Sequence, residues 1–177
     1  DRVSNAITLS GFESLPPTYQ IIKEMYRQIP DLKFSDGKFM VVSPDEGGIS
    51  RAMYFASILG VPLGTFYKRR DYTKVVNGRN PIVAHEFLGD SVEGMDILIV
   101  DDMISSGESI LEVAGELKKR KANRIFVFST FGLFTNGLEK FDEAYEKGII
   151  DKVFTTNLIY RTPELSAREW YYNVDMS

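Results

Sequence analysis

The stretch DILIVDDMISSGES, residues 96–109, decides the fold of this chain. It contains four consecutive branched apolar residues, Ile97 to Val100, as expected for a strand that is covered on both faces. Two aspartates follow directly, and a turn rich in hydroxyls and glycine then leads into residues 106–120, whose apolar side chains recur at helical spacing. A buried strand that passes through polar residues into a helix is the repeating unit of a parallel α/β sheet.

Outward from this stretch, short apolar runs alternate with segments of helical period. We expect strands at 39–42, 62–67, 82–87, 96–100, 125–129, 153–156 and 171–174, helices at 18–28, 106–120 and 135–147, and one more helix that carries Met53, Phe55, Ala56 and Leu59 and ends at Gly60. The predicted fold class is therefore α/β, with a mainly parallel twisted sheet and helices on both faces. Because no repeat or linker interrupts residues 1–177, we expect one domain.

Composition narrows the classes of function. The chain has 177 residues, 44% of them hydrophobic and 26% charged, and a net charge of −4, so a general attraction to nucleic acid or to a membrane surface is not expected and any anion site must be local. It has no cysteine, and His85 is its one histidine, which excludes a thiol nucleophile and a thiolate zinc site but leaves a hard cation with oxygen ligands. Without a signal-like start or a long apolar run, a cytoplasmic location is expected.

The turn after the strand at 39–42 is the first candidate site. Its sequence is Ser43-Pro44-Asp45-Glu46-Gly47-Gly48. Paired glycines allow backbone N–H groups to approach an anion closely, and a carboxylate beside a phosphate commonly shares Mg²⁺ with it. The alternative is an ordinary tight turn between a strand and a helix.

The turn after the strand at 96–100 is the second candidate site. Adjacent acids at the end of a buried strand, here Asp101 and Asp102, are costly unless a ligand such as a pair of ribose hydroxyls or a hydrated Mg²⁺ uses them. The hydroxyls of Ser105, Ser106 and Ser109, together with the N–H group of Gly107, form a cradle suited to a phosphomonoester. Helix capping by Ser105 or Ser106 would explain one serine but not the acid pair.

Residues 68–79 form the third candidate site, which we call the basic segment. It holds five basic residues against one acid, a net charge of +4 in a chain whose total is −4. Such a local excess indicates an arm that closes on a polyanion, whereas the alternative is a solvated charged loop.

Together these motifs resemble the phosphoribosyl-pyrophosphate binding motif of the type I phosphoribosyltransferase fold. The run Tyr67-Lys68-Arg69-Arg70 is similar to the catalytic flexible loop of one such family, the ribose-phosphate diphosphokinases, or phosphoribosyl pyrophosphate synthetases, and the resemblance extends over nearly the whole chain. It implies that Lys68 and Arg70 stabilise the transferring diphosphoryl group. It also implies a pyrophosphate loop of Asp45, Gly47 and Gly48 with Asp45 at the metal, and a ribose 5-phosphate site of Asp101, Asp102, Ser105, Ser106, Gly107 and Ser109.

The resemblance also implies a reaction and partners. ATP and ribose 5-phosphate would give AMP and phosphoribosyl pyrophosphate with Mg²⁺ as cofactor, in an enzyme that assembles as a homo-oligomer, a dimer or hexamer. The chain corresponds to the C-terminal half of that family, and the ATP-binding elements belong to the N-terminal half. We therefore expect a domain of a longer chain that holds the sugar-phosphate and pyrophosphate sites and makes little or no product alone.

Two positions depart from the family pattern, and the single histidine is a third position of interest. Ser105 stands where the family loop has an acid that some purine phosphoribosyltransferases use as a base, and Glu108 replaces a glycine but is expected to face solvent. His85 lies in a strand-like run, and as a lone histidine without an acidic partner it is expected to have a structural role. The alternatives to the diphosphokinase are a nucleobase phosphoribosyltransferase and a non-catalytic regulatory homologue, although the retained basic segment argues against the latter.

Overall fold

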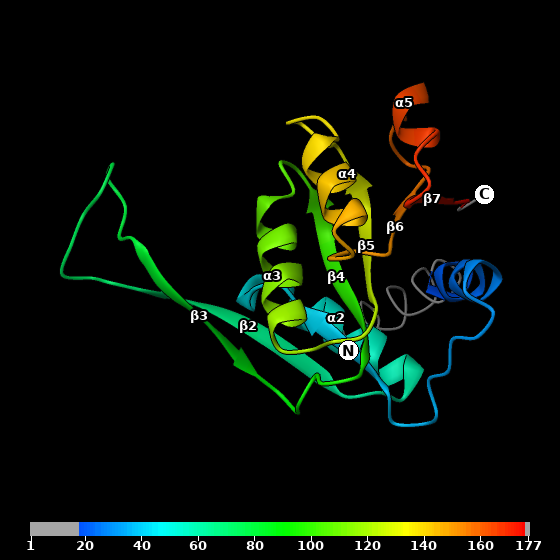
Figure 1. Cartoon of the computed structure of the whole chain (residues 1–177), viewed down its shortest axis with the longest axis horizontal. Helices are drawn as coiled ribbons and strands as arrows, with labels where there is room; N and C mark the ends of the chain where they lie inside the picture. The colour runs from blue at the N-terminus through cyan, green and yellow to red at the C-terminus, as the bar shows by residue number, and fades with distance from the viewer. Residues whose placement is uncertain (1–17, 176–177) are drawn as a thin grey trace, which may run out of the picture.

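The computed structural model describes residues 18–175, with the backbone alone at 82 and 83, and its framework is one seven-stranded sheet (Figure 1). The strand order is β3-β2-β1-β4-β5-β6-β7. Every neighbouring pair is parallel except β2 and β3, which are antiparallel. The strands are β1 (Phe39–Ser43), β2 (Leu63–Arg70), β3 (Ile82–Leu88), β4 (Asp96–Ile104), β5 (Ile125–Gly132), β6 (Lys152–Thr156) and β7 (Tyr171–Val174).

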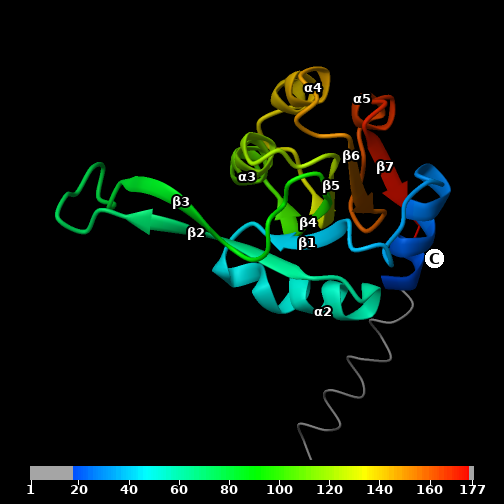
Figure 2. The same cartoon turned by 60° about the horizontal axis from the view of Figure 1, so that its bottom comes forward.

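Helices cover both faces of this sheet, as predicted (Figure 2). One face carries α3 and α4, and the other carries α2 and the helix of residues 18–28. The elements are η1 (Glu46–Gly48), α2 (Ile49–Leu59), α3 (Glu108–Lys119), α4 (Glu139–Glu146) and α5 (Pro163–Ser166). Among the described residues, no helix is long and apolar enough to cross a membrane.

The core explains the continuous apolar run that decides the fold. Along β4, Ile97 and Ile99 pack with α3 and α4, whereas Leu98 and Val100 pack with α2, and all four are fully buried. Successive strand residues point to opposite faces, so a strand between two helical layers needs apolar side chains at every position.

Several strands are longer than the sequence predicts, and two of these extensions, in β4 and β2, shape the candidate site. β4 continues through the two aspartates to Ile104, because its last residues still pair with β5, Ile104 opposite Gly132. β2 continues through the start of the basic segment to Arg70, because β3 pairs with it. The start of the basic segment is therefore a strand of a hairpin that projects from the body of the sheet (Figures 1 and 2).

Two helices are shorter at their starts than predicted, and one predicted helix end is confirmed. α3 begins at Glu108 because Gly107 has φ +80°, and α4 begins only after Gly137, which has φ +82°. Gly60 ends α2 in the left-handed conformation, as expected for a glycine cap.

Candidate functional site

The first two candidate loops lie side by side at one edge of the sheet. β1 and β4 are parallel neighbours, with Val42 opposite Ile99, so the turns that follow them leave the sheet at the same end. The position agrees with the rule that ligands of open α/β sheets bind beyond the carboxyl ends of the strands.

The loop after β1 is a tight turn closed by its own polar groups. The backbone N–H of Gly48 donates to Oδ1 of Asp45 at 3.1 Å, and Oγ of Ser43 donates to the carbonyl oxygen of Asp45 at 2.6 Å. A Cβ on Gly48 would lie 3.0 Å from Oγ of Ser43, and one on Gly47 would lie 3.3 Å from Oδ1 of Asp45. Both contacts are tight, so a side chain at either glycine would require Ser43 or Asp45 to shift by a few tenths of an ångström.

The two aspartates at the end of β4 differ in environment. Burial raises the pKa of Asp101, and the nearby charges of Asp45 and Asp102 act in the same direction. The backbone N–H of Asp102 donates to Oδ1 of Asp101 at 2.7 Å and partly offsets this increase. Asp102 itself is exposed. Carboxylates from both loops thus converge, which gives the edge of the sheet a concentrated negative charge.

Arg51, which our sequence analysis missed, supplies a cation between the loops. It lies in the first turn of α2, and its NH2 group is 3.1 Å from Oδ1 of Asp102. The guanidinium also lowers the pKa of Asp101. Its position three residues after Gly48 was the available signal, because the first turn of a helix that follows a loop lies next to that loop.

The loop after β4 is shaped by Gly107, which is buried against α4. A Cβ at this position would lie 2.2 Å from Cε2 of Phe141, and φ is +80°, so only glycine fits without rearrangement. Oγ of Ser105 lies 3.5 Å from Oγ1 of Thr135. The capping alternative finds little support in the described residues. The N-cap of α3 is Gly107, which makes no side-chain cap, and Oγ of Ser106 accepts only a long, 3.4 Å bond from the N–H of Glu108.

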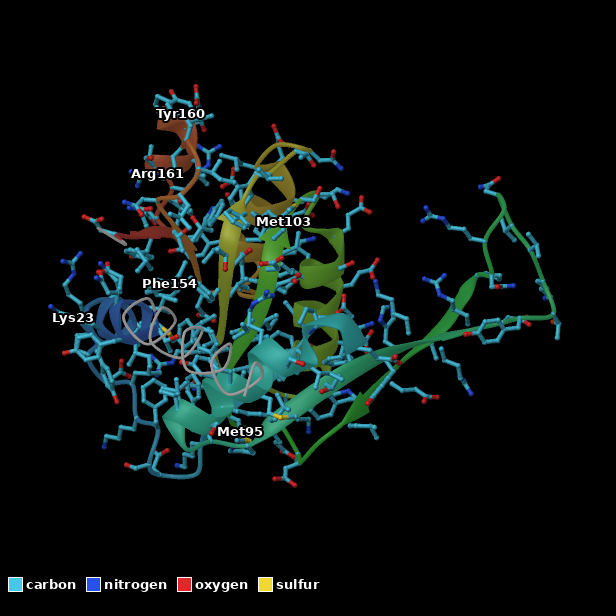
Figure 3. All side chains as sticks on the ribbon, turned by 180° about the vertical axis from the view of Figure 1, so that it is seen from behind. Lys23, Met95, Met103, Phe154, Tyr160 and Arg161 are labelled. Atoms are coloured by element: carbon cyan, nitrogen blue, oxygen red, sulfur yellow. The ribbon has the colours of Figure 1, made fainter. Side chains whose placement is uncertain are left out.

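The hairpin of β2 and β3 carries the basic segment, and we call it the basic hairpin. It reaches the loop after β4 through one lysine. Nζ of Lys68 donates to Oγ of Ser109 at 3.1 Å, across 41 residues of sequence. Arg70 does not reach it, because its NH1 group donates to the carbonyl oxygen of Asn80 at 2.9 Å, inside the hairpin. Figure 3 shows the hairpin side chains standing clear of the sheet, while the labelled Met103, which follows the two aspartates, lies on the body of the molecule.

Two further side-chain contacts concern residues singled out in the sequence. Glu108 is exposed, as expected, and its Oε1 is 2.7 Å from Nζ of Lys140 on α4, which lowers the pKa of Glu108. His85 on β3 does have an acidic partner, since its Nε2 is 3.6 Å from Oε2 of Glu112 on α3. Nothing in the local sequence signals this second pair, because the two residues belong to separate elements.

Comparison with known proteins finds a family model and relatives that match most of this chain. The family model described as phosphoribosyl transferase domain matches residues 10–159. Two curated relatives are named ribose-phosphate pyrophosphokinase. The one from Mycoplasma genitalium is 38% identical over 154 residues, and the one from Ureaplasma parvum is 32% identical over 153 residues. The matches cover 84% and 86% of this chain but 43% of each relative, so the chain spans less than half the length of these proteins.

Solved structures agree on the fold. The phosphoribosylpyrophosphate synthetase from Mycobacterium smegmatis matches with a TM-score of 0.67 at 23% identity, over 87% of this chain and 46% of that chain. An adenine phosphoribosyltransferase matches with a TM-score of 0.51 at 20% identity, over 73% of this chain and 74% of that chain. With the family model matching most of its length, the chain belongs to the phosphoribosyl transferase domain family.

Proposed function

We propose that this chain is the sugar-phosphate and diphosphate-binding part of a ribose-phosphate diphosphokinase. That enzyme transfers diphosphate from ATP to ribose 5-phosphate and gives AMP and phosphoribosyl pyrophosphate. The names of relatives at 32–38% identity support this function. The observation that carries it is the contact of Lys68 with Ser109, since it joins a basic hairpin to a loop suited to a sugar phosphate.

Ribose 5-phosphate would be held by the loop after β4. Asp101 and Asp102 offer carboxylate oxygens that accept hydrogen bonds from the ribose hydroxyls. The N–H groups at the start of α3 and three hydroxyls would surround the 5-phosphate, and the neutral donors favour a monoester at a helix N-terminus. The residues of this phosphate site are Ser105, Ser106, Gly107 and Ser109.

Diphosphate would bind beside it, in the loop of Asp45, Gly47 and Gly48. Mg²⁺ fits the oxygen donors here, because the charges of Asp45 and Asp102 both raise the pKa of Asp101, and a hydrated cation would relieve this repulsion. Within residues 18–175 no three acidic or histidine side chains are placed to hold a metal by themselves, which agrees with Mg²⁺ held through one or two carboxylates, water and substrate phosphates. When bound, Mg²⁺ would neutralise diphosphate oxygens.

The reaction needs charge stabilisation more than a nucleophilic side chain. The oxygen of the sugar 1-hydroxyl bonds to the β-phosphorus of ATP and its proton is released to solvent, while the bond from the β-phosphorus to the α,β-bridging oxygen breaks. AMP leaves with the negative charge on that oxygen. Lys68 and Arg70 would neutralise the diphosphoryl oxygens during transfer. For Arg70 this requires leaving the carbonyl oxygen of Asn80, so the hairpin must change conformation when substrates bind.

The wider assignment rests on the relatives. They are more than twice as long as the matched region, and we propose that residues 1–177 form one domain of such a longer enzyme, with most of the ATP site supplied elsewhere. A homo-oligomer, dimer or hexamer, and a cytoplasmic location belong to the same proposal. Alone, the chain should bind ribose 5-phosphate and phosphoribosyl pyrophosphate and form little AMP.

Calorimetric titration of the 177-residue chain with phosphoribosyl pyrophosphate tests this function. We expect binding that requires Mg²⁺ and is lost in Asp102→Asn, while AMP formation from ATP and ribose 5-phosphate stays near background. Absence of binding, or rapid AMP formation by the chain alone, would contradict the proposal. Release of pyrophosphate that depends on an added nucleobase would instead identify a nucleobase phosphoribosyltransferase, and binding without turnover in the whole protein would favour a regulatory homologue.

A further inference from the structure

The base of the hairpin is attached to α3 by three contacts in a row. Lys68 donates to Ser109 at 3.1 Å, His85 lies 3.6 Å from Glu112, and the guanidinium of Arg120 stacks 5.6 Å from the ring centre of Phe87. Ser109 and Glu112 are three residues apart on α3, so they occupy the same face of that helix. We propose that Glu112, through His85, is a positioning residue that holds Lys68 at the phosphate loop.

The strand register explains why fixing His85 also fixes Lys68. The two residues are directly opposite each other in the antiparallel pair of β2 and β3, so both side chains point from the same side of the ribbon. Two residues closer to the core, Phe66 and Phe87 form the same kind of pair, with ring centres 5.0 Å apart and Phe66 fully buried. The ribbon is therefore rigid where it leaves the core.

The environment of His85 makes Glu112 its defining partner. The side chain of His85 is 20% exposed, and among the described residues its buried Nδ1 has no hydrogen-bond partner. Its other nitrogen faces the carboxylate of Glu112, while Lys68 is the charged neighbour on the opposite strand. A ring that is mostly buried and has a single polar contact takes its orientation from that contact.

Between the Lys68–His85 pair and its tip, the hairpin makes its polar contacts mainly among its own residues. A register shift follows Arg69, and Arg70 donates to Asn80 within the hairpin. Among the described side chains, the contact of His85 with Glu112 is thus the polar contact between β3 and the body of the chain that lies nearest the tip. Lys68 is catalytic only in the proposed diphosphokinase, so the positioning role of Glu112 rests on that function. The attachment of the hairpin to α3 is independent of it.

Glu112→Gln tests the attachment, with Glu116→Gln as matched control. Glu116 lies one turn further along α3 and pairs with Lys119 rather than with the hairpin. We expect Glu112→Gln to raise amide hydrogen exchange in β3 by about three- to fivefold, as the loss of a weak, partly exposed contact allows. The acylation rate of Lys68, measured by mass spectrometry, should rise by a similar factor. The control should change neither. Equal behaviour of the two variants would overturn the inference.

A double-mutant cycle tests whether the effect acts through Lys68. Glu112→Gln should weaken binding of phosphoribosyl pyrophosphate about threefold in the parent chain and leave it unchanged in a Lys68→Ala background. The same loss in both backgrounds would overturn the positioning role, because Glu112 would then act without Lys68. If the parent chain does not bind the ligand at all, the proposed function fails, and the exchange and acylation rates still decide the attachment.

Discussion

The two loops at the edge of the sheet and the basic hairpin beside them are built in opposite ways. The loops after β1 and β4 pack against the body of the molecule, as Gly107 packs against the ring of Phe141. The hairpin tip is bound to itself, with Val76 and Arg79 joined by backbone hydrogen bonds and Tyr72 78% exposed. Under the proposed function, the sugar-phosphate site would be preformed, whereas neutralisation of the diphosphoryl charge would depend on a ribbon that has to move. Substitutions should therefore separate the two functions.

Arg70→Ala should produce the largest effect. In a full-length enzyme that contains this domain, we expect turnover to fall by about 10²- to 10³-fold, because the lost cation acts mainly in the transition state. Sugar-phosphate binding and the melting temperature should change little, since Arg70 bonds only within the hairpin in the described structure. Steady-state kinetics and calorimetry measure both.

Arg69→Ala is the matched control for Arg70. It lies next to Arg70 on β2 but pairs with Glu86 at 3.2 Å on an exposed face, where such pairs contribute about 1 kcal/mol or less. If both substitutions reduce turnover equally, the hairpin contributes only its total charge, and the specific role of Arg70 is wrong.

Arg69 and Arg70 also show which features of the fold could be predicted from the sequence. The sheet and its helices were predictable, because buried runs such as Ile97 to Val100 and helical spacing are local patterns. The extension of β2 through Arg70 was not, because basic residues have no strand preference and it is pairing with β3 that extends the strand. The predicted arm is consequently a ribbon at its base.

The candidate site was predictable at the level of motifs and not of contacts. Asp45 and Gly107 stand out because each follows a strand, and Asp101 because it comes directly after a buried apolar run. The pairing of Arg51 with Asp102, like that of His85 with Glu112, joins residues from separate elements. Such partners depend on how α2, α3 and the hairpin pack, which no local pattern in the sequence encodes.

Gly107→Ala should cause the largest loss of stability. A glycine substitution in the hairpin should cost less than this one in the loop after β4. A methyl group would meet the ring of Phe141, and φ of +80° is unfavourable for alanine, so we expect a loss of about 2–4 kcal/mol in the free energy of unfolding. Gly78→Ala is the control in the hairpin. Its φ is +76° but no atom lies within 4 Å of the added Cβ, so about 1 kcal/mol is expected. Equal losses in urea denaturation would contradict the contrast between the two regions.

Asp101→Asn should separate binding from stability. We expect affinity for phosphoribosyl pyrophosphate to fall about 10- to 100-fold, because a charged acceptor is lost. The pKa of Asp101 is raised in the folded chain, so its protonated form adds stability below the ordinary value near 3.8, and this stability is lost as pH rises through the raised pKa.

At pH 7 the variant should therefore melt at the same or a higher temperature than the parent, and the difference should shrink as pH falls toward 4. Thermal melts across this range measure it. A variant that melts lower at every pH would show that Asp101 is a structural residue rather than a strained binding residue.

Lys140→Ala should have the smallest effect and tests whether Glu108 is neutralised. Lys140 lowers the pKa of Glu108, so the pair stabilises the fold above the ordinary value near 4.5, and this contribution disappears as pH falls through the lowered pKa. Because both side chains are exposed, the melting temperature should shift little and only at low salt.

The informative readout is affinity for ribose 5-phosphate. Without Lys140, the charge of Glu108 in the first turn of α3 is uncompensated, and we expect about twofold weaker binding at low salt. Lys147→Ala is the control, since Lys147 pairs with Glu143 at 2.6 Å at the other end of α4. If both variants bind equally, Glu108 lies outside the field of the phosphate, and a glutamate is tolerated there without help from α4.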